Sequence, residues 1–194
     1  MTKFKVYDNF LLPSYANYLE TLMLSKSIKW EHQDHMDHDD SYPQNVLGIL
    51  DEGYSIAHNT MYHALAGMIG QIIDQLMPDQ HPVRIRGVKQ RSISDNIQFY
   101  PPHTDMTDDG GYSLIYYPTD CTGDTYLFAE KDINDVSFVE NNDTTNYNWE
   151  PTDQVSPKKN RIIVFPSNNY HAGSPPSQIR YLINFNFLPL NNLT

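Results

Sequence analysis

The chain has 194 residues, with 13 Lys and Arg against 24 Asp and Glu, so its formal net charge is −11 at pH 7. A field of this sign repels phosphate backbones and anionic lipid surfaces, which argues against nucleic-acid and membrane partners. The single cysteine, Cys121, excludes an intrachain disulfide and every cysteine-rich metal motif. Neither a signal-peptide pattern nor an apolar run of the ~20 residues that cross a bilayer is present. We therefore expect one domain over residues 1–194 with a cytoplasmic location.

Two helices with one apolar face each are predicted in the first part of the chain. Over residues 8–25, apolar side chains recur with helical spacing, and a longer stripe of the same kind covers residues 57–77. The second helix is expected to end at Pro78, because proline does not continue a helix. Residues 31–45 are polar and charged and are interpreted as a surface loop. The sequence thus predicts a helical buttress over about residues 8–80.

The hydrophobic period changes after the second helix. Short runs of β-branched and aromatic residues alternate with Gly, Pro, Asn and Asp, a pattern typical of strands joined by turns. These predicted strands cover residues 83–88, 96–100, 112–117, 125–128, 136–139, 161–165 and 181–188. Short strands after two helices indicate an α+β chain, mainly β, with an antiparallel sandwich or barrel over about residues 83–189. The polar segment 130–158 is predicted as a long loop or hairpin insertion, either a lid over a substrate or a surface elaboration.

His103 and Asp105 form the first pattern with chemical meaning. On an extended strand, residues i and i+2 point to the same face, so this imidazole and this carboxylate are expected to converge. His171, which follows the predicted strand 161–165, would add a second imidazole. Two histidines and one carboxylate on one face of an octahedral ion leave three positions open, which suits Fe(II) that binds a cosubstrate and O₂ together. The HxD tripeptide alone is a weak signal, because it arises often by chance.

The last predicted strand strengthens the case for a site. With a period of two, one of its faces is apolar and the other carries polar groups: Tyr181, Ile183, Phe185 and Phe187 against Arg180, Leu182, Asn184 and Asn186. An arginine on the inner face of an apolar strand is costly unless it lines a site. Arg180 is suited to holding a carboxylate through a two-point hydrogen-bonded fork.

These passages resemble the Fe(II)/2-oxoglutarate-dependent dioxygenases, and within them the prolyl-hydroxylase-like branch. The segments that carry the resemblance are 6–11, 103–105, 115–117, 123–125, 157–166 and 171–180. The short spacing between His171 and Arg180 is closer to the prolyl-hydroxylase branch than to the alkylated-base demethylases. Two turns depart from the family pattern, with Asp124 and Asn160 in place of glycines. Both residue types tolerate left-handed backbone conformations, so the departures concern turns and not the metal site.

The resemblance implies a double-stranded β-helix, a cupin-like jelly roll, with the N-terminal helices packed on its larger sheet. His103, Asp105 and His171 would be the catalytic residues and would hold the metal, Fe(II). Arg180 would pair with the 5-carboxylate of the cosubstrate 2-oxoglutarate. The implied reaction consumes O₂, oxidises the substrate and releases succinate and CO₂, with ascorbate as a supporting reductant.

Five further residues are candidates for binding the cosubstrate. Tyr117 is similar to the family tyrosine that also reaches the 5-carboxylate, and Tyr116 is the alternative, because a slip of one residue exchanges the two faces of a strand. Asn96, Tyr100 and Asn184 are candidates for lining the pocket. Ordinary packing within a sheet explains each of these three equally well.

The expected function is hydroxylation of a peptidyl, proline-like substrate, with a small-molecule substrate close behind. One alternative is a cupin-type metalloenzyme without 2-oxoglutarate, in which Arg180 would have no cosubstrate to hold. The other is a non-catalytic jelly-roll module for binding or assembly, which would show no dependence on iron.

Overall fold

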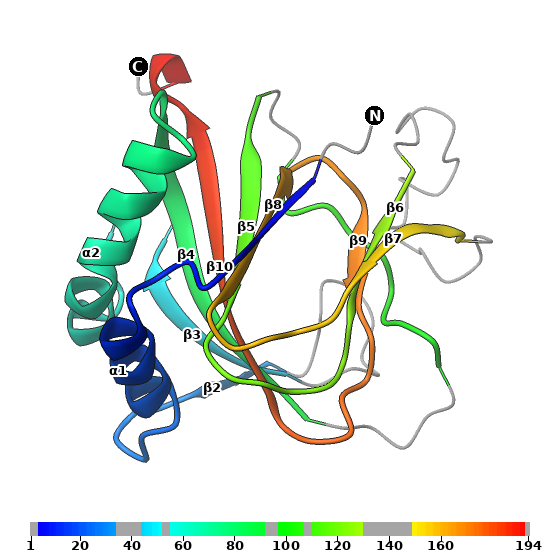
Figure 1. Cartoon of the computed structure of the whole chain (residues 1–194), viewed down its shortest axis with the longest axis horizontal. Coiled ribbons are helices and arrows are strands. Elements are labelled where there is room, and N and C mark those ends of the chain that lie inside the picture. Colours follow the sequence, from blue (N-terminus) through cyan, green and yellow to red (C-terminus); the bar gives the residue numbers. More distant parts are fainter. Residues whose placement is uncertain are drawn as a thin grey trace.

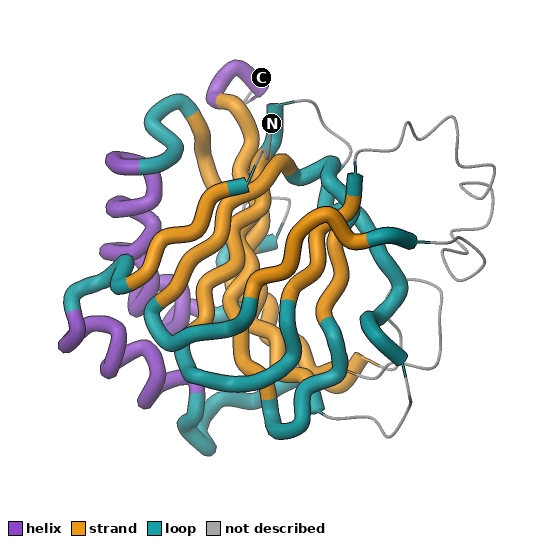
Figure 2. The backbone as a smooth tube through the Cα atoms, turned by 45° about the vertical axis from the view of Figure 1, so that its right-hand side comes forward, coloured by secondary structure: helices purple, strands orange, loops and turns teal. Residues whose placement is uncertain are grey.

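The computed structural model describes residues 4–33, 44–51, 55–91, 97–106, 110–129 and 149–192 (Figure 1). Within these ranges the strands form two antiparallel sheets, and both helices lie against the outer face of the larger one (Figures 1 and 2). The elements are β1 Lys5–Asp8, α1 Pro13–Met23, β2 Glu31–Gln33, β3 Gln44–Leu50, α2 Asn59–Gln75, β4 Gln80–Gln90, β5 Tyr112–Tyr117, β6 Thr125–Phe128, β7 Pro151–Val155, β8 Arg161–Pro166, β9 His171–Gly173 and β10 Arg180–Pro189, with a 3-10 turn at Leu190–Asn192.

The larger sheet has the strand order β1-β8-β5-β10-β4-β3-β2, and the smaller sheet has the order β7-β6-β9. Strands that are neighbours in space are mostly distant in sequence, as in the pairs β1 with β8 and β5 with β10. Two facing antiparallel sheets joined by such crossovers form a jelly roll. The predicted fold class, mainly β with a double-stranded β-helix and helices on the major sheet, is confirmed.

The two helices lie close to their predicted positions and pack through the predicted faces. Pro13 opens α1, where a missing N–H costs nothing. The ring nitrogen Nδ1 of His58 caps α2 by accepting the backbone N–H of Met61 at 3.3 Å. The hydroxyl of Tyr15 pins the helices together, because it donates to the carbonyl of Ala64 at 2.6 Å and accepts from the N–H of Met68 at 3.2 Å.

Strand β10 separates two apolar layers, and the predicted alternation of its side chains is confirmed. Ile183, Phe185 and Phe187 are fully buried against the helices. Leu182 belongs to a second cluster between the two sheets, together with Tyr117. The polar side chains of β10, Arg180, Asn184 and Asn186, therefore lie inside the jelly roll and face the smaller sheet.

Asn160, one of the two departures from the family pattern, has a structural reason. Its φ is +62°, a conformation that side chains other than glycine and asparagine rarely adopt. Its Oδ1 accepts the backbone N–H of Leu11 and its Nδ2 donates to the carbonyl of the same residue, both at 2.8 Å. Asparagine thus serves the turn before β8 and also anchors the segment that leads into α1.

Several sequence-based boundaries are wrong. The predicted loop 31–45 contains β2 at one end and the start of β3 at the other, and these strands pair at the sheet edge, where polar residues are tolerated. Residues 97–100, predicted to be extended, are not in a strand. The hairpin interpretation of 130–158 is met in part, because β7 pairs with β6. Residues 130–148, which include the predicted strand 136–139, lie outside the described residues.

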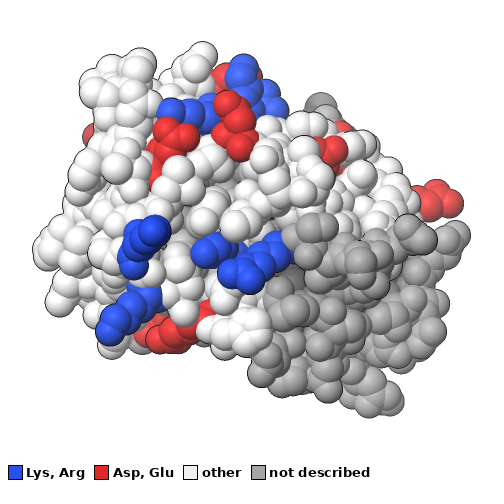
Figure 3. All heavy atoms as spheres, turned by 90° about the horizontal axis from the view of Figure 1, so that it is seen from below, with Lys and Arg blue, Asp and Glu red and all other residues white. Residues whose placement is uncertain are grey.

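No described helix has both the length and the apolar character that a membrane crossing requires. On the face shown in Figure 3, basic and acidic side chains are mixed, and the described residues of that face form no broad basic patch. The cytoplasmic location stays a prediction.

Candidate metal centre

His103 and His171 are brought together by their own backbones. The N–H of His103 donates to the carbonyl of His171 at 3.0 Å, and the reverse bond measures 2.9 Å. His171 is the first residue of β9, whereas His103 does not belong to a strand and pairs with His171 through this single bridge. The expectation of a regular strand over the HxD pair is therefore wrong. The two imidazole centroids nevertheless lie 4.5 Å apart.

Asp105 joins the pair through a bend and not through strand alternation. Its backbone N–H donates to the carbonyl of Ser167 at 3.1 Å, which turns the chain back toward the histidines. One ligand atom from each of His103, Asp105 and His171 lies within 4.8 Å of the others. Among the described residues, this is the one group of three His, Cys, Asp or Glu side chains with the geometry to hold a metal ion.

The hydrogen bonds of the imidazoles fix which nitrogen faces the cluster. Nδ1 of His103 lies 3.3 Å from the carbonyl of Pro101, and Nδ1 of His171 lies 3.2 Å from the carbonyl of Asn169. A carbonyl only accepts, so both Nδ1 atoms act as donors, and in a neutral imidazole with this tautomer Nε2 is the atom that carries the lone pair. Nε2 of His171 lies 3.6 Å from Oδ2 of Asp105. The ring nitrogen of His171 that does not face a carbonyl therefore lies beside the carboxylate of Asp105.

The surroundings of Asp105 keep it ionised. Burial acts to raise the pKa of this carboxyl, but the pull of the histidines, a hydrogen bond from Ser113 and the charge of Arg84 together hold it well below its usual range. Burial lowers the pKa of His171 to about 4, so this imidazole is neutral at pH 7. Ionised carboxylate and neutral imidazole are the forms that bind a divalent cation. The residues present therefore fit a metal such as Fe(II).

Arg180 is a buried cation held by neutral groups. Its side chain is 2% exposed, and its Nη1 and Nη2 donate to Oε1 of Gln90 at 2.8 Å and to Oγ1 of Thr125 at 2.6 Å. The ring of Tyr117 lies 5.7 Å from its Cζ atom. In the described part of the chain no carboxylate pairs with Arg180, and its Nε has no partner. Because a buried charge without a counter-ion is costly, this arrangement calls for an anionic ligand.

The structure separates the two candidate tyrosines. Tyr117 lies inside the jelly roll, and its hydroxyl forms a 2.7 Å hydrogen bond with the hydroxyl of Thr125, beside Arg180. Tyr116 lies on the helix side, where its hydroxyl donates to Oδ1 of Asn160 at 3.4 Å. Only Tyr117 is thus placed to reach a ligand of Arg180.

The other pocket candidates have different surroundings. Asn184 contacts the metal-site carboxylate, with its Nδ2 at 3.1 Å and 3.2 Å from the two oxygens of Asp105. Tyr100 is buried, and its N–H donates to the carbonyl of Gly173 at 2.8 Å. Asn96 lies outside the described residues.

Sequence reasoning missed several residues that surround this site. Gln90 pairs with Arg180 across β4 and β10, and Thr125 lies on β6 of the opposite sheet. Arg84 and Ser113 contact Asp105 from β4 and β5. Gln90, Arg84 and Ser113 lie on strands whose side chains alternate between the two faces of the sheet. That alternation identifies them as neighbours of the site only when the register of β4 and β5 against β10 is known.

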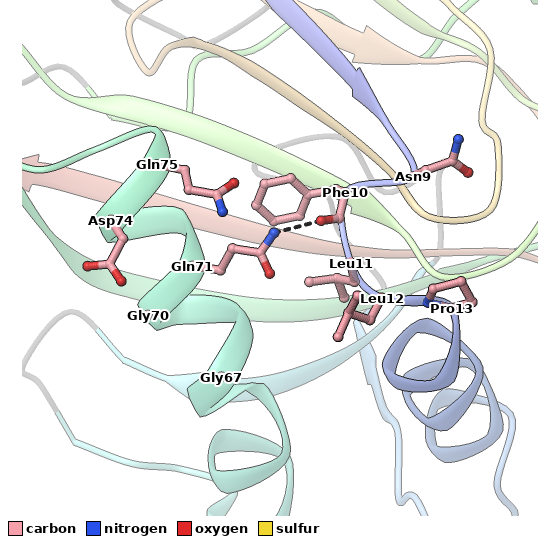
Figure 4. Close-up of a pocket in the computed structure, with 10 residues that line it drawn as sticks. All are labelled: Asn9, Phe10, Leu11, Leu12, Pro13, Gly67, Gly70, Gln71, Asp74 and Gln75. Carbon is pink, nitrogen blue, oxygen red and sulfur yellow. Dashed lines mark hydrogen bonds between the residues drawn. The ribbon is translucent and has the colours of Figure 1, made fainter.

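A separate surface pocket does not contain this chemistry. It has a volume of about 690 Å³ and lies between the connection from β1 to α1 and one face of α2 (Figure 4). Gln71 donates across it to the carbonyl of Phe10 at 2.6 Å. Asp74 is the one titratable group in its lining. None of the three candidate metal ligands lines this pocket, and neither does Arg180.

A jelly roll with two histidines and one carboxylate on its inner side has the architecture of mononuclear non-haem iron oxygenases. Residues 90–188 match the family model of the 2OG-Fe(II) oxygenase superfamily, a range that contains the three candidate ligands and Arg180. The chain belongs to this superfamily and is an oxidoreductase of the class that uses Fe(II), 2-oxoglutarate and O₂. No curated protein sequence matches the chain significantly.

Solved structures with a similar fold include enzymes of different specificities. A prolyl-4-hydroxylase from Pseudomonas putida superposes with a TM-score of 0.59 at 15% identity, covering 96% of this chain and 92% of that one. A prolyl hydroxylase from Trichoplax adhaerens, solved with a peptide of hypoxia inducible factor, gives 0.60 at 16%, covering 98% and 86%. The epimerase SnoN of nogalamycin biosynthesis gives 0.65 at 10%, covering 96% and 78%. At these identities the likeness shows a shared fold.

Proposed function

We propose that the chain is a 2-oxoglutarate-dependent hydroxylase with one domain over residues 1–194, in which residues 8–80 buttress the jelly-roll core at 83–189. Its leading substrate class is a peptidyl, proline-like side chain, and a small molecule is the second. The observation that carries the proposal is the buried Arg180, which has no anionic partner among the described residues and lies within the same inner layer as the metal cluster.

The metal would be held by Nε2 of His103, Nε2 of His171 and one oxygen of Asp105. When bound, Fe(II) supplies the centre at which 2-oxoglutarate and O₂ react to give succinate, CO₂ and an oxidised substrate. The protein supplies the geometry: the carbonyls of Pro101 and Asn169 orient the imidazoles through their Nδ1–H groups. Ascorbate would keep the metal in its reduced state.

The 5-carboxylate of 2-oxoglutarate would be the missing partner of Arg180. A guanidinium binds a carboxylate by paired, charge-assisted hydrogen bonds, and the hydroxyls of Tyr117 and Thr125 lie beside it as further donors. Gln90 accepts from Nη1 and Thr125 accepts from Nη2, so the two contacts together fix the plane of the guanidinium. Arg180 is 2% exposed, so water has little access to these bonds, which strengthens them.

The peptidyl substrate rests on the spacing of His171 and Arg180, which resembles the prolyl-hydroxylase branch. The similar structures include one solved with a peptide and one epimerase from nogalamycin biosynthesis, so the fold accommodates both proposed classes. Proline-rich peptides and free small molecules should therefore be screened together.

Succinate release tests the function directly. Purified protein with Fe(II), ascorbate and 2-oxoglutarate should form some succinate even without substrate, and a productive peptide should stimulate it. Asp105→Ala is the matched inactive control. Metal binding without any binding of 2-oxoglutarate would favour the cupin-type enzyme. Binding of neither ligand would favour a non-catalytic module.

A further inference from the structure

Arg84, on β4, is tied directly to the metal-site carboxylate. Its Nη2 donates to the backbone carbonyl of Asp105 at 3.1 Å and to Oδ1 of the same residue at 3.2 Å. The two side chains are 13% and 6% exposed, so this ion pair is largely shielded from water. We propose that Arg84 is a positioning residue that engages Oδ1 of Asp105, so that the metal receives a single carboxylate oxygen, Oδ2.

A closed ring of hydrogen bonds fixes this arrangement. Nε of Arg84 donates to Oδ1 of Asn186 at 2.8 Å, and Nδ2 of Asn186 donates to Oγ of Ser113 at 2.9 Å. The hydroxyl of Ser113 donates in turn to Oδ2 of Asp105 at 2.6 Å. Asn186 is the register partner of Arg84 on one side and of Ser113 on the other, so three adjacent strands hold the ring rigid. Arg84 therefore reaches the carboxylate twice, directly at Oδ1 and through Asn186 and Ser113 at Oδ2, and hydrogen bonds linked in this way polarise and strengthen one another.

The ring gives the two carboxylate oxygens different roles. Asn184 donates to both oxygens, at 3.1 Å and 3.2 Å, and Ser113 donates to Oδ2, so the contact that distinguishes Oδ1 is the one with the guanidinium of Arg84. Oδ2 is the oxygen that lies 3.6 Å from Nε2 of His171. A cation held by the imidazole therefore meets Oδ2, while the fixed charge of Arg84 keeps Oδ1 away from it.

One oxygen or two makes a chemical difference. Three protein ligands leave three positions on an octahedral ion, and 2-oxoglutarate and O₂ together need all of them. A carboxylate that binds through both oxygens would take one of these positions. The guanidinium also repels a divalent cation and competes with it for the carboxylate. Arg84 thus lowers the affinity for the metal and preserves room for the cosubstrate; the second half of this inference rests on the proposed function.

Removing Arg84 should therefore change metal affinity and 2-oxoglutarate affinity in opposite directions, and a general loss of structure would not do so. Full-length Arg84→Met, kept free of oxygen, is titrated by calorimetry first with Mn(II) and then, metal-loaded, with 2-oxoglutarate. We expect metal binding to tighten by roughly tenfold and 2-oxoglutarate binding to weaken by roughly tenfold, the range of one charge-assisted contact. A residue with a merely structural role would weaken both. Weakening of both, or no change in either, overturns the inference.

Two further variants keep the test decisive. Arg161→Met removes an arginine of the same sheet that pairs with Asp8 at 2.7 Å and 3.0 Å, away from the metal cluster, and should change neither affinity. Arg84→Gln removes the charge but keeps amide donors. If Arg84→Met does not fold, the glutamine variant must show the same two signs at smaller size, and the inference fails if it does not. Unmodified protein that binds neither ligand defeats the proposed function instead.

Discussion

Gly173 on β9 and Arg180 on β10 approach so closely that a Cβ atom on Gly173 would lie 2.5 Å from Nη1 of Arg180. The glycine is thus needed for space, and it lets the guanidinium lie between the two sheets and reach Gln90. Any side chain at this position must displace the arginine.

Gly173→Ala should therefore weaken 2-oxoglutarate binding at least about tenfold, because a charge-assisted contact is disturbed. Metal affinity should stay within about twofold of the unmodified protein, since His171 keeps its backbone pairing. Calorimetry with Mn(II) and then 2-oxoglutarate measures both. Gly70→Ala is the control, because nothing lies within 4 Å of a Cβ there. Equal binding of 2-oxoglutarate by both variants would contradict the assigned role of Arg180.

Asn160→Ala should destabilise the protein by about 2–4 kcal/mol, as it removes two buried hydrogen bonds to Leu11 and leaves a strained left-handed residue. Asn160→Gly should cost less, because glycine relieves the strain. Chemical denaturation followed by circular dichroism gives both free energies of unfolding. A smaller loss for alanine than for glycine would show that the φ of +62° is not a constraint.

Removing the hydroxyl in Tyr15→Phe should cost about 1–2 kcal/mol, because the carbonyl of Ala64 and the N–H of Met68 lose a shared partner. Burial raises the pKa of Tyr15, so the hydroxyl stays protonated and able to donate at neutral pH. Thermal unfolding measures the loss. Tyr18→Phe is the control, since Tyr18 is half exposed on the same helix, and a loss equal to that of Tyr15→Phe would argue against the inter-helix contact.

The metal-free protein should lose stability as the pH falls from about 6.5 to about 4. The folded pKa of His171 is lowered to about 4 from the ordinary value of 6.5, so within this window the unfolded chain binds a proton that the native state does not. Stability therefore rises with pH across it. His171→Gln should remove this dependence, so that the free energy of unfolding changes by on the order of 1–3 kcal/mol less between the two pH values than in the unmodified protein. An unchanged slope would mean that this imidazole is not buried as a neutral base.

The elements with strong local periodicity could be predicted from the sequence. The two helices and the two faces of β10 follow from apolar spacing, which is a property of the segment alone. Strands β1, β2, β7 and β9 were not predicted, because they are short and distant partners stabilise them. Strand β3 was missed as well, although it carries an apolar run. Their pairing is a long-range property that no local pattern carries.

The sequence predicted that His103 and Asp105 lie close together, but it predicted this from a strand geometry that the structure does not have. His103 and Asp105 converge through the backbone bridge to His171 and through a bend at Asp105, whose N–H donates to Ser167, not through strand alternation. The supporting residues, above all Arg84, depend on the register between strands, which the sequence does not display.

The central claim is that one ion held by the histidines and Asp105, together with Arg180, binds 2-oxoglutarate. The most direct measurement is an oxygen-free titration of the Fe(II)-loaded protein with 2-oxoglutarate, followed by the visible charge-transfer absorption of the chelated metal. We predict a saturable band for the unmodified protein and a midpoint at least about tenfold higher for Arg180→Met. Bound Fe(II) that gives no band, or a midpoint that Arg180→Met does not move, would contradict the account.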